Sequence, residues 1–415
     1  MSKSVLLIEP PYYKLFGYDR WYYPQTITLV GTYFKKLGYE VNIYDGDVRD
    51  NNCRTLSRSE LIRSFPKYYK NLENDKLPIW KDIRNAIKKY SPDILGISSI
   101  SPKIESSRRV AEIAREEFGN NLKIILGGTH VQAMFQSNPK YKFNKIFDEV
   151  VPKIKNLIDR RPNINLIVNS EEYTPRDISC ILTSVGCHNS CTYCCNSMNL
   201  DKKIEYRSIK YIEEELQDIA NRFGDRVSIK VLDDNLILNM KRYHTIGNIM
   251  KKNKLKFRAL TRVPPISRSM LKSFKEYGGD RLFVGVESGS QGILDEIRKN
   301  ITIEEIIKKS KLINEEGVKW NAYIMVGFPF ETLEDIKKTE KLMYKIEPTY
   351  ISLNRFTPYP GTKIWQDYYK NKNIRFGDLF QLNKVVKLRR DIDNYVEKMF
   401  KDIELYNKER NEDYK

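Results

Sequence analysis

Six short apolar segments alternate with amphipathic segments between residues 178 and 355, and this alternation limits the possible folds more than any other feature. The apolar segments have the length of buried strands, and the segments between them have helical periodicity. Strands are predicted at 178–184, 228–232, 257–262, 281–286, 320–326 and 350–355. The clearest helix, predicted at 303–316, is followed by Gly317, as is typical of a helix end. Six such units predict an open, partial (β/α)6 barrel whose active end lies where the strands finish.

The first part of the chain shows a second strand–helix alternation. Strands are predicted at 5–8, 40–44, 94–100 and 123–126, and helices at 26–37, 79–90 and 106–118. Alternation of this kind builds a parallel, doubly wound α/β sheet of the Rossmann type. Such sheets bind ligands beyond the carboxyl ends of their strands.

The length of 415 residues is sufficient for two or three domains. A Rossmann-like domain is predicted at 1–140 and a connection at 141–176, where the pattern is less regular. The partial barrel is predicted at 177–370 and a charged helical extension at 371–415.

The formal charge of +18 raises the question of nucleic-acid binding. However, the lysines are scattered among Glu and Asp residues and form no dense basic tract, which favours a solvated lysine-rich surface. The sequence shows neither an apolar run long enough to span a bilayer nor a secretory leader pattern. A cytoplasmic protein without a membrane span is therefore expected, and nucleic acid is not an expected partner.

Four of the six cysteines fall between positions 187 and 195, directly after the first barrel strand. Cys187, Cys191 and Cys194 have the spacing Cys-x3-Cys-x2-Cys. Three thiolates on one loop can hold three irons of a 4Fe–4S cubane and leave the fourth iron open to another ligand. A structural zinc site is the alternative, but it needs a fourth Cys or His ligand in tetrahedral geometry. Spacing and position favour the cluster.

This cysteine motif resembles that of the radical S-adenosylmethionine (SAM) superfamily. Four further segments resemble motifs of the cobalamin-associated branch of that superfamily and occur in the same order: 231–235, 285–290, 327–332 and 356–361. Together with the cysteines they cover residues 180–365. The match therefore extends over the whole predicted barrel.

The resemblance implies that the open iron binds the amino and carboxylate groups of SAM, whose cleavage gives a 5′-deoxyadenosyl radical. It also implies roles for six further residues around SAM. Tyr193 is expected beside the adenine, Asp233 and Asp234 at the methionyl ammonium, Arg262 at the carboxylate, and Glu287 and Ser288 at the ribose. The alternative for each is an ordinary polar residue that satisfies a loop at a strand end.

The first domain resembles the cobalamin-binding domain that precedes this barrel in one branch of the superfamily. The resemblance rests on Glu9-Pro-Pro11, on 38–41 followed by Asp45, on 92–98 and on Gly127-Gly-Thr-His130. It implies that Ser98, Ser99, Gly127 and Gly128 line the nucleotide tail of cobalamin.

Two departures from the cobalamin-binding pattern leave an alternative open. The Asp-x-His-x-x-Gly motif that supplies a histidine to cobalt is absent, and so is the Gly-Glu-Gly-Glu segment that usually follows the fifth strand. The domain could therefore be a vestigial one that only packs on the barrel. An aromatic loop is expected either to contact a flat macrocycle or substrate or to cover a domain interface: Tyr12, Tyr13, Phe16, Tyr18, Trp21, Tyr22 and Tyr23.

The resemblance implies a cobalamin-dependent radical SAM methyltransferase that acts on an unactivated carbon through a 5′-deoxyadenosyl radical and methylcobalamin. The first alternative keeps the barrel but catalyses rearrangement, cyclisation or carbon–carbon bond formation without methyl transfer. A nucleic-acid-binding or cluster-sensing protein with a degenerate barrel is the second. The expected partners are an electron donor such as flavodoxin or ferredoxin and a small-molecule or peptide substrate.

Overall fold

The computed structural model describes residues 3–20, 22–50, 53, 55–154, 156–198, 203–380 and 383–410. Its contacts divide the chain into two compact units. Unit 1 comprises Met1–Ile178 and Tyr359–Asn383, and unit 2 comprises Ser179–Pro358 and Lys384–Lys415. The domain boundaries expected from the sequence stay predictions. The contacts place residues 141–176 and 359–383 in unit 1, and residues 384–415 in unit 2.

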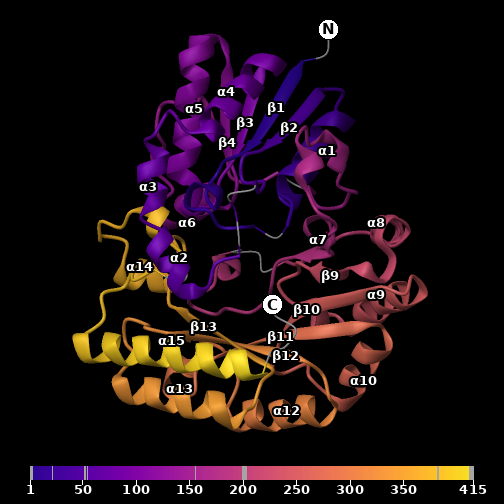
Figure 1. Ribbon diagram of the computed structural model, residues 1–415, viewed down its shortest axis with the longest axis vertical. Coiled ribbons are helices and arrows are strands. Elements are labelled where there is room, and N and C mark those ends of the chain that lie inside the picture. The colour runs from indigo at the N-terminus through magenta and orange to yellow at the C-terminus, as the bar shows by residue number, and fades with distance from the viewer. Residues whose placement is uncertain are drawn as a thin grey trace. The chain divides into compact units, whose positions relative to one another are not determined.

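Unit 1 is built on a five-stranded parallel sheet with the order β2-β1-β3-β4-β5 (Figure 1). Its strands are β1 (Ser4–Glu9), β2 (Glu40–Asp45), β3 (Ile94–Ser98), β4 (Lys123–Gly127) and β5 (Glu149–Val151). The strand order reverses between β1 and β3, and this switch point is where sheets of this kind bind ligands at the carboxyl ends of their strands. The predicted Rossmann-type fold is confirmed.

The described residues of unit 1 also form helices. They are α1 (Gln25–Lys36), α2 (Arg58–Ser64), α3 (Lys67–Leu72), α4 (Pro78–Tyr90), α5 (Ile104–Phe118), α6 (Thr129–Ser137), α7 (Pro175–Ile178) and α14 (Lys363–Tyr368). Helix α1 packs on β1 and β2, and α4 packs on α5. In α4, Ile79, Ile83 and Ile87 recur at helical spacing and are buried, so the helix forms where the sequence pattern predicts it.

Unit 2 is built on a six-stranded parallel sheet with the order β13-β12-β11-β10-β9-β6. Its strands are β6 (Cys180–Ile181), β9 (Ser228–Val231), β10 (Lys256–Arg262), β11 (Gly279–Glu287), β12 (Trp320–Val326) and β13 (Tyr350–Arg355). Neighbouring strands follow one another in sequence order, which is the arrangement of an open (β/α)6 barrel. The predicted barrel is confirmed.

The helices of unit 2 follow these strands along the chain and lie along the outside of the sheet (Figure 1). They are α8 (Ile209–Phe223), α9 (Met240–Lys252), α10 (Arg268–Glu276), α11 (Gln291–Glu296), α12 (Ile303–Glu315), α13 (Leu333–Lys345) and α15 (Arg390–Arg410). Local sequence sets where they begin: Thr332 and Asp335 form a capping box at the start of α13.

Helix α15 closes the open edge of the barrel at β13. Asn407 accepts a hydrogen bond from the Ile351 amide at 2.9 Å and donates one to the Ile351 carbonyl, also at 2.9 Å, as a neighbouring strand would. At the end of β13, the buried Arg355 donates to Asp393 at 2.6 Å and to Glu397 at 2.7 Å. The helical segment predicted near the C-terminus therefore protects an edge strand. Within the described residues, no helix combines the length and the apolar character that crossing a bilayer requires.

The first barrel strand is shorter than predicted. The sequence predicted one strand over 178–184, but β6 ends at Ile181, and Ser184–Val185 forms a separate strand, β7, that pairs antiparallel with β8 (Glu205–Tyr206). The cause is a side chain: the Thr183 amide donates to a carboxylate oxygen of Asp233 at 2.5 Å, so it does not extend the pairing with β9.

Candidate active site

The cysteine motif lies on a loop between β7 and β8, which pair with each other and close the loop at its base. Within the loop, the Cys194 amide donates to the Cys191 carbonyl at 3.1 Å, so a tight turn brings these two residues together. Cys191 is buried, whereas Cys187 and Cys194 are half-buried. Residues 199–202 of this loop lie outside the described residues. We call the segment 186–198 the cluster loop.

Side chains donate hydrogen bonds to the sulfur atoms of Cys187 and Cys191. Asn189 donates through Nδ2 to Cys187 Sγ at 3.1 Å, and Arg262 donates through Nη1 to Cys191 Sγ at 3.2 Å. Donors of this kind stabilise negatively charged, metal-bound sulfur. The donor set therefore fits an iron–sulfur cluster.

The thiol of Cys194 needs a metal to lose its proton at neutral pH. Burial raises its pKa to about 11, and the nearby Cys191 thiol adds to the effect. Metal binding displaces such protons. Among the described residues, no three or more His, Cys, Asp or Glu side chains converge on a single-ion site, so the ligand role of Cys187, Cys191 and Cys194 stays a prediction.

Two acidic residues at the end of β9 hold the start of the cluster loop. Asp233, only 3% exposed, accepts from the Thr183 amide at 2.5 Å and from the Ser184 hydroxyl at 2.6 Å. Asp234 accepts from the Gly186 amide at 2.9 Å and from Asn196 Nδ2 at 2.6 Å. Both carboxylates thus have partners within the chain, as expected for the alternative in which they are ordinary polar residues that satisfy a loop at a strand end. Their predicted contact with the methionyl ammonium stays a prediction.

The end of β11 presents a buried ion pair beside the cluster loop. Glu287 has a left-handed backbone, with φ at 71°, which is uncommon for a residue with a side chain. Its Oε1 lies 2.7 Å from Nζ of Lys299, which is 3% exposed and lies 3.4 Å from the hydroxyl of Tyr193. The structure therefore brings Tyr193 and Glu287 together, as the predicted adenosine contacts require.

Two other predicted SAM contacts are engaged elsewhere. Ser288 is fully buried, its hydroxyl lies 3.1 Å from Thr339 Oγ1, and it accepts from the Ser290 amide at 3.1 Å. Arg262, at the end of β10, donates to Cys191 and, through Nη2, to the Lys299 carbonyl. Lys299 was missed by sequence reasoning, because it lies twelve residues after Glu287 and belongs to no recognisable motif.

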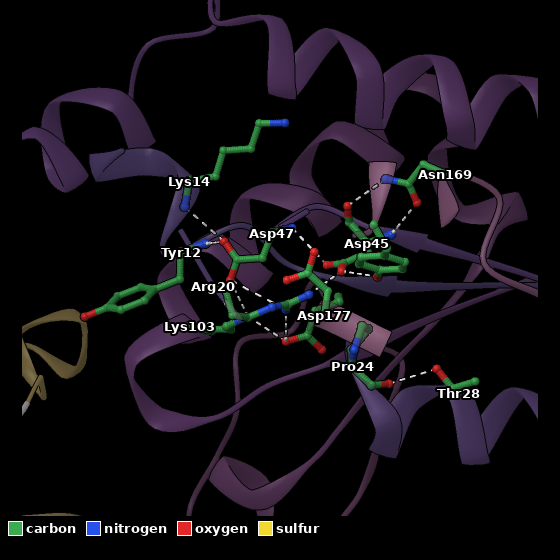
Figure 2. A network of polar contacts seen from close by, with 12 residues as sticks. Tyr12, Lys14, Arg20, Pro24, Thr28, Asp45, Asp47, Lys103, Asn169 and Asp177 are labelled. Carbon is green, nitrogen blue, oxygen red and sulfur yellow. Dashed lines mark hydrogen bonds and ion pairs between the residues drawn. The ribbon is translucent and has the colours of Figure 1, made fainter. Parts of the chain in front are cut away.

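In unit 1, a buried ion-pair network occupies the strand ends at the switch point (Figure 2). Lys103, which follows β3 and is 2% exposed, donates to Glu9 at the end of β1 at 2.5 Å and to Asp47 at 2.6 Å. Arg20 pairs with Asp45 at the end of β2. The signal for this network in the sequence is weak, because its members are far apart in the chain.

The network shifts the pKa values of Asp47 and Glu9 in opposite directions. Burial alone would raise the pKa of Asp47, but Lys103 and Arg20 outweigh burial and hold that pKa below its usual range. For Glu9, burial raises the pKa despite the same two cations. Asn169 binds the backbone of Asp45 through both amide atoms, at 2.9 and 3.1 Å, and so joins residues far apart in the sequence.

The predicted cobalamin contacts lie on the other side of the switch point, at the ends of β3 and β4. Ser98 and Gly127 are half-buried, which leaves backbone accessible to a nucleotide tail. Ser99 is 1% exposed, and its hydroxyl donates to the Ile100 carbonyl at 3.1 Å. A Cβ on Gly128, whose φ is 102°, would lie 2.5 Å from the Ser99 carbonyl oxygen, so Gly128 is needed by the chain itself. The contact of these four residues with a nucleotide tail stays a prediction.

Gly128→Ala should destabilise unit 1 even without cobalamin, by about 1–3 kcal/mol, because it combines a left-handed backbone with a clash. Thermal unfolding monitored by circular dichroism measures the change. Gly127→Ala is the matched control, since its Cβ would meet only the Val151 carbonyl oxygen, at 3.5 Å. Equal stability of both variants would contradict the conclusion that the fold of unit 1 requires a glycine at position 128.

Two members of the aromatic loop, Tyr12 and Phe16, pack in the core of unit 1. Tyr12 is fully buried and Phe16 is 2% exposed, and their rings contact Phe65, with Tyr68 and Phe380 nearby. Tyr12 also donates to the Gly377 carbonyl at 3.0 Å. Tyr12 and Phe16 therefore do not present a free face to a macrocycle, and they act as core residues. Trp21 lies outside the described residues.

Two family models match the chain. The model of the radical SAM superfamily matches residues 181–343, and that of the B12 binding domain matches residues 21–153. An uncharacterised methyltransferase of Pyrococcus horikoshii is 26% identical over 368 residues, which cover 78% of this chain and 80% of that protein. The anaerobic magnesium-protoporphyrin IX monomethyl ester cyclase of Cereibacter sphaeroides is 22% identical over 332 residues, which cover 68% of this chain but only 54% of the cyclase.

Solved structures share the fold. The radical SAM methyltransferase TsrM of Kitasatospora setae, with tryptophan and a SAM analogue bound, superposes with a TM-score of 0.64 at 14% identity, over 88% of this chain and 75% of TsrM. The cobalamin-dependent radical SAM enzyme OxsB, with aqua-cobalamin bound, gives a TM-score of 0.59 at 17% identity, over 82% of this chain and 52% of OxsB. The two family-model matches confirm the resemblances inferred from the motifs in both parts of the chain.

Proposed function

Because the chain belongs to the radical SAM superfamily and carries a B12-binding domain, we propose that it is a cobalamin-dependent methyltransferase acting on an unactivated carbon. The observation that carries the proposal is the loop of Cys187, Cys191 and Cys194 at the strand ends of a partial barrel, in a chain with this second domain. The likeness to a methyltransferase over 78% of the chain supports it.

When bound, the 4Fe–4S cluster, SAM and cobalamin supply the radical and the methyl carrier. The protein holds and orients them. Cys187, Cys191 and Cys194 ligate three irons, and Asp234 holds the cluster loop in place through Gly186. Residues at the strand ends of the barrel would hold SAM next to the cluster.

Tyr193 and Glu287 bind the adenosine part of SAM. The ion pair between Glu287 and Lys299 fixes the carboxylate before SAM arrives, so little ordering remains to be done on binding. The ring of Tyr193 packs against Phe328, at 6.1 Å between ring centroids, and Phe328 packs on Phe356 at 5.0 Å. These aromatic side chains exclude water from one side of Tyr193.

In unit 1, Ser98 and Gly127 bind the nucleotide tail of cobalamin, while Ser99 and Gly128 support the loop behind them. Electrons come from a flavodoxin or ferredoxin, the substrate is a small molecule or a peptide, and the reaction takes place in the cytoplasm. These partners follow from the chemistry of the superfamily.

Anaerobic reconstitution with iron, sulfide and hydroxocobalamin tests the proposal. We expect an iron–sulfur absorbance shoulder together with corrin bands. With a reductant and SAM carrying a deuterated methyl group, both 5′-deoxyadenosine and S-adenosylhomocysteine should form, because one SAM is cleaved and another donates its methyl group. A cluster without corrin, and 5′-deoxyadenosine without S-adenosylhomocysteine, would contradict methyl transfer.

A further inference from the structure

Arg262 is held in place by two contacts at the cluster loop. Its Nη1 donates to Cys191 Sγ at 3.2 Å, and its Nη2 donates to the backbone carbonyl of Lys299. The same segment is tied to the cluster loop by the Thr192 amide, which donates to the Ile297 carbonyl at 3.0 Å. The guanidinium group therefore lies at a fixed place beside one candidate cluster ligand.

The charge of Arg262 remains close to the sulfur. Within the part of the chain that the structure describes, Arg262 donates to a sulfur atom and to a carbonyl oxygen, and to no carboxylate. The other buried cation nearby, Lys299, is neutralised by Glu287 at 2.7 Å. Cys191 thus accepts a hydrogen bond from a donor that also carries a positive charge.

We propose that Arg262 is a positioning residue that raises the reduction potential of the cluster. Reduction adds one electron, and so one negative charge, to the cluster and its sulfur ligands. A charged N–H donor stabilises the reduced form more than the oxidised form, because the bond strengthens as the acceptor becomes more negative. This role differs from the SAM carboxylate contact expected from the sequence, because the two donor groups are already engaged at Cys191 and Lys299.

The experiment is a redox titration of the reconstituted protein without SAM, followed by electron paramagnetic resonance. Arg262→Gln should lower the midpoint potential. We expect the equilibrium constant for one-electron reduction to fall by about tenfold, which corresponds to about 59 mV. Arg262→Lys keeps the charge but not the paired donors, so it should shift the potential in the same direction by less.

Arg258→Gln is the matched control. Arg258 lies on the same strand, but its guanidinium group pairs with Asp280 at 2.8 Å near the surface. Its removal deletes an equal charge without touching a cysteine, so the midpoint potential should stay at the wild-type value. An equal shift in both variants would mean that only long-range charge matters, and it would overturn the proposed direct role.

Equilibrium dialysis with SAM distinguishes the two roles of Arg262. We expect the Kd for SAM to change by less than about twofold in Arg262→Gln. An unchanged midpoint potential with a weaker affinity for SAM would overturn the inference and assign Arg262 to the carboxylate. If Arg262→Gln assembles no cluster, the midpoint potential and the Kd for SAM of Arg262→Lys distinguish the two roles instead. The inference rests on the proposed cluster site and not on methyl transfer. If the reconstituted wild-type protein bound no cluster, the cluster site itself would be wrong, and this outcome is distinct from an unchanged potential in Arg262→Gln.

Discussion

Cys191→Ala is expected to abolish cluster assembly and to reduce 5′-deoxyadenosine formation to background. Cys191 is the buried member of the three cysteines, its carbonyl accepts the Cys194 amide, and its sulfur accepts the Arg262 guanidinium. Loss of one of three ligands leaves a second iron without a protein ligand, so the chain would hold the cubane at two corners only and would not retain it. Iron and sulfide content, the visible spectrum and product analysis after anaerobic reconstitution measure the effect.

Cys195→Ala is the matched control, because Cys195 is adjacent to Cys194 in the chain and is half-buried like it. It is not among the proposed ligands, so cluster content should stay within error of the wild type. If Cys195→Ala removed the cluster and Cys191→Ala did not, the ligand assignment would be wrong. A single zinc ion per chain in the wild type would instead favour a structural zinc site at these cysteines.

Local sequence patterns were sufficient to place the barrel. The strands at 320–326 and 350–355 agree with β12 and β13 at both ends, and the helix at 303–316 agrees with α12 to within one residue. Apolar periodicity and end signals act within a few residues, so they can be recognised without knowing the fold. The first strand was wrong in extent because its course depends on Asp233, fifty residues further along the chain.

Only the part of the candidate site that forms a recognisable sequence motif could be predicted. The cysteine spacing identifies the loop, but nothing in the sequence pairs Arg262 with Cys191, 71 residues away, or Lys299 with Glu287. Long-range partners are chosen by the tertiary structure, and a lone Lys or Arg gives no signal of its burial. The same reason explains why the aromatic loop was expected to contact a macrocycle or substrate or to cover a domain interface, whereas Tyr12 packs in the core.

Lys103→Met is expected to lower the free energy of unfolding of unit 1 by about 3–5 kcal/mol, because it leaves buried carboxylates without their closest cation. Lys103 contacts Glu9 and Asp47 at 2.5 and 2.6 Å, whereas Arg20 lies 3.9 and 4.0 Å from the same two groups. Urea denaturation followed by circular dichroism gives the magnitude, and hydrogen exchange of the β1 and β3 amides shows that the loss is in unit 1.

Lys88→Met is the control for this variant. Lys88 is 55% exposed and pairs with Glu117 at 2.8 Å, and removing such a surface pair should cost less than about 1 kcal/mol. Adding Asp47→Asn to Lys103→Met should recover part of the loss, because it removes one of the unpaired charges. Equal stability of Lys103→Met and the wild type would show that the network contributes nothing to folding.

The deficit of Lys103→Met should depend on pH, and the sign follows from Asp47. Its folded-state pKa is lowered by Lys103 and Arg20 against the effect of burial, so ionised Asp47 contributes stability above its unfolded pKa of about 3.9 and loses it as the pH falls. Without Lys103 that contribution is missing at neutral pH. The two proteins should therefore differ most near pH 7 and converge in acid. A deficit that stays constant from pH 7 to well below the unfolded pKa of about 3.9 would instead point to lost packing of the lysine stem.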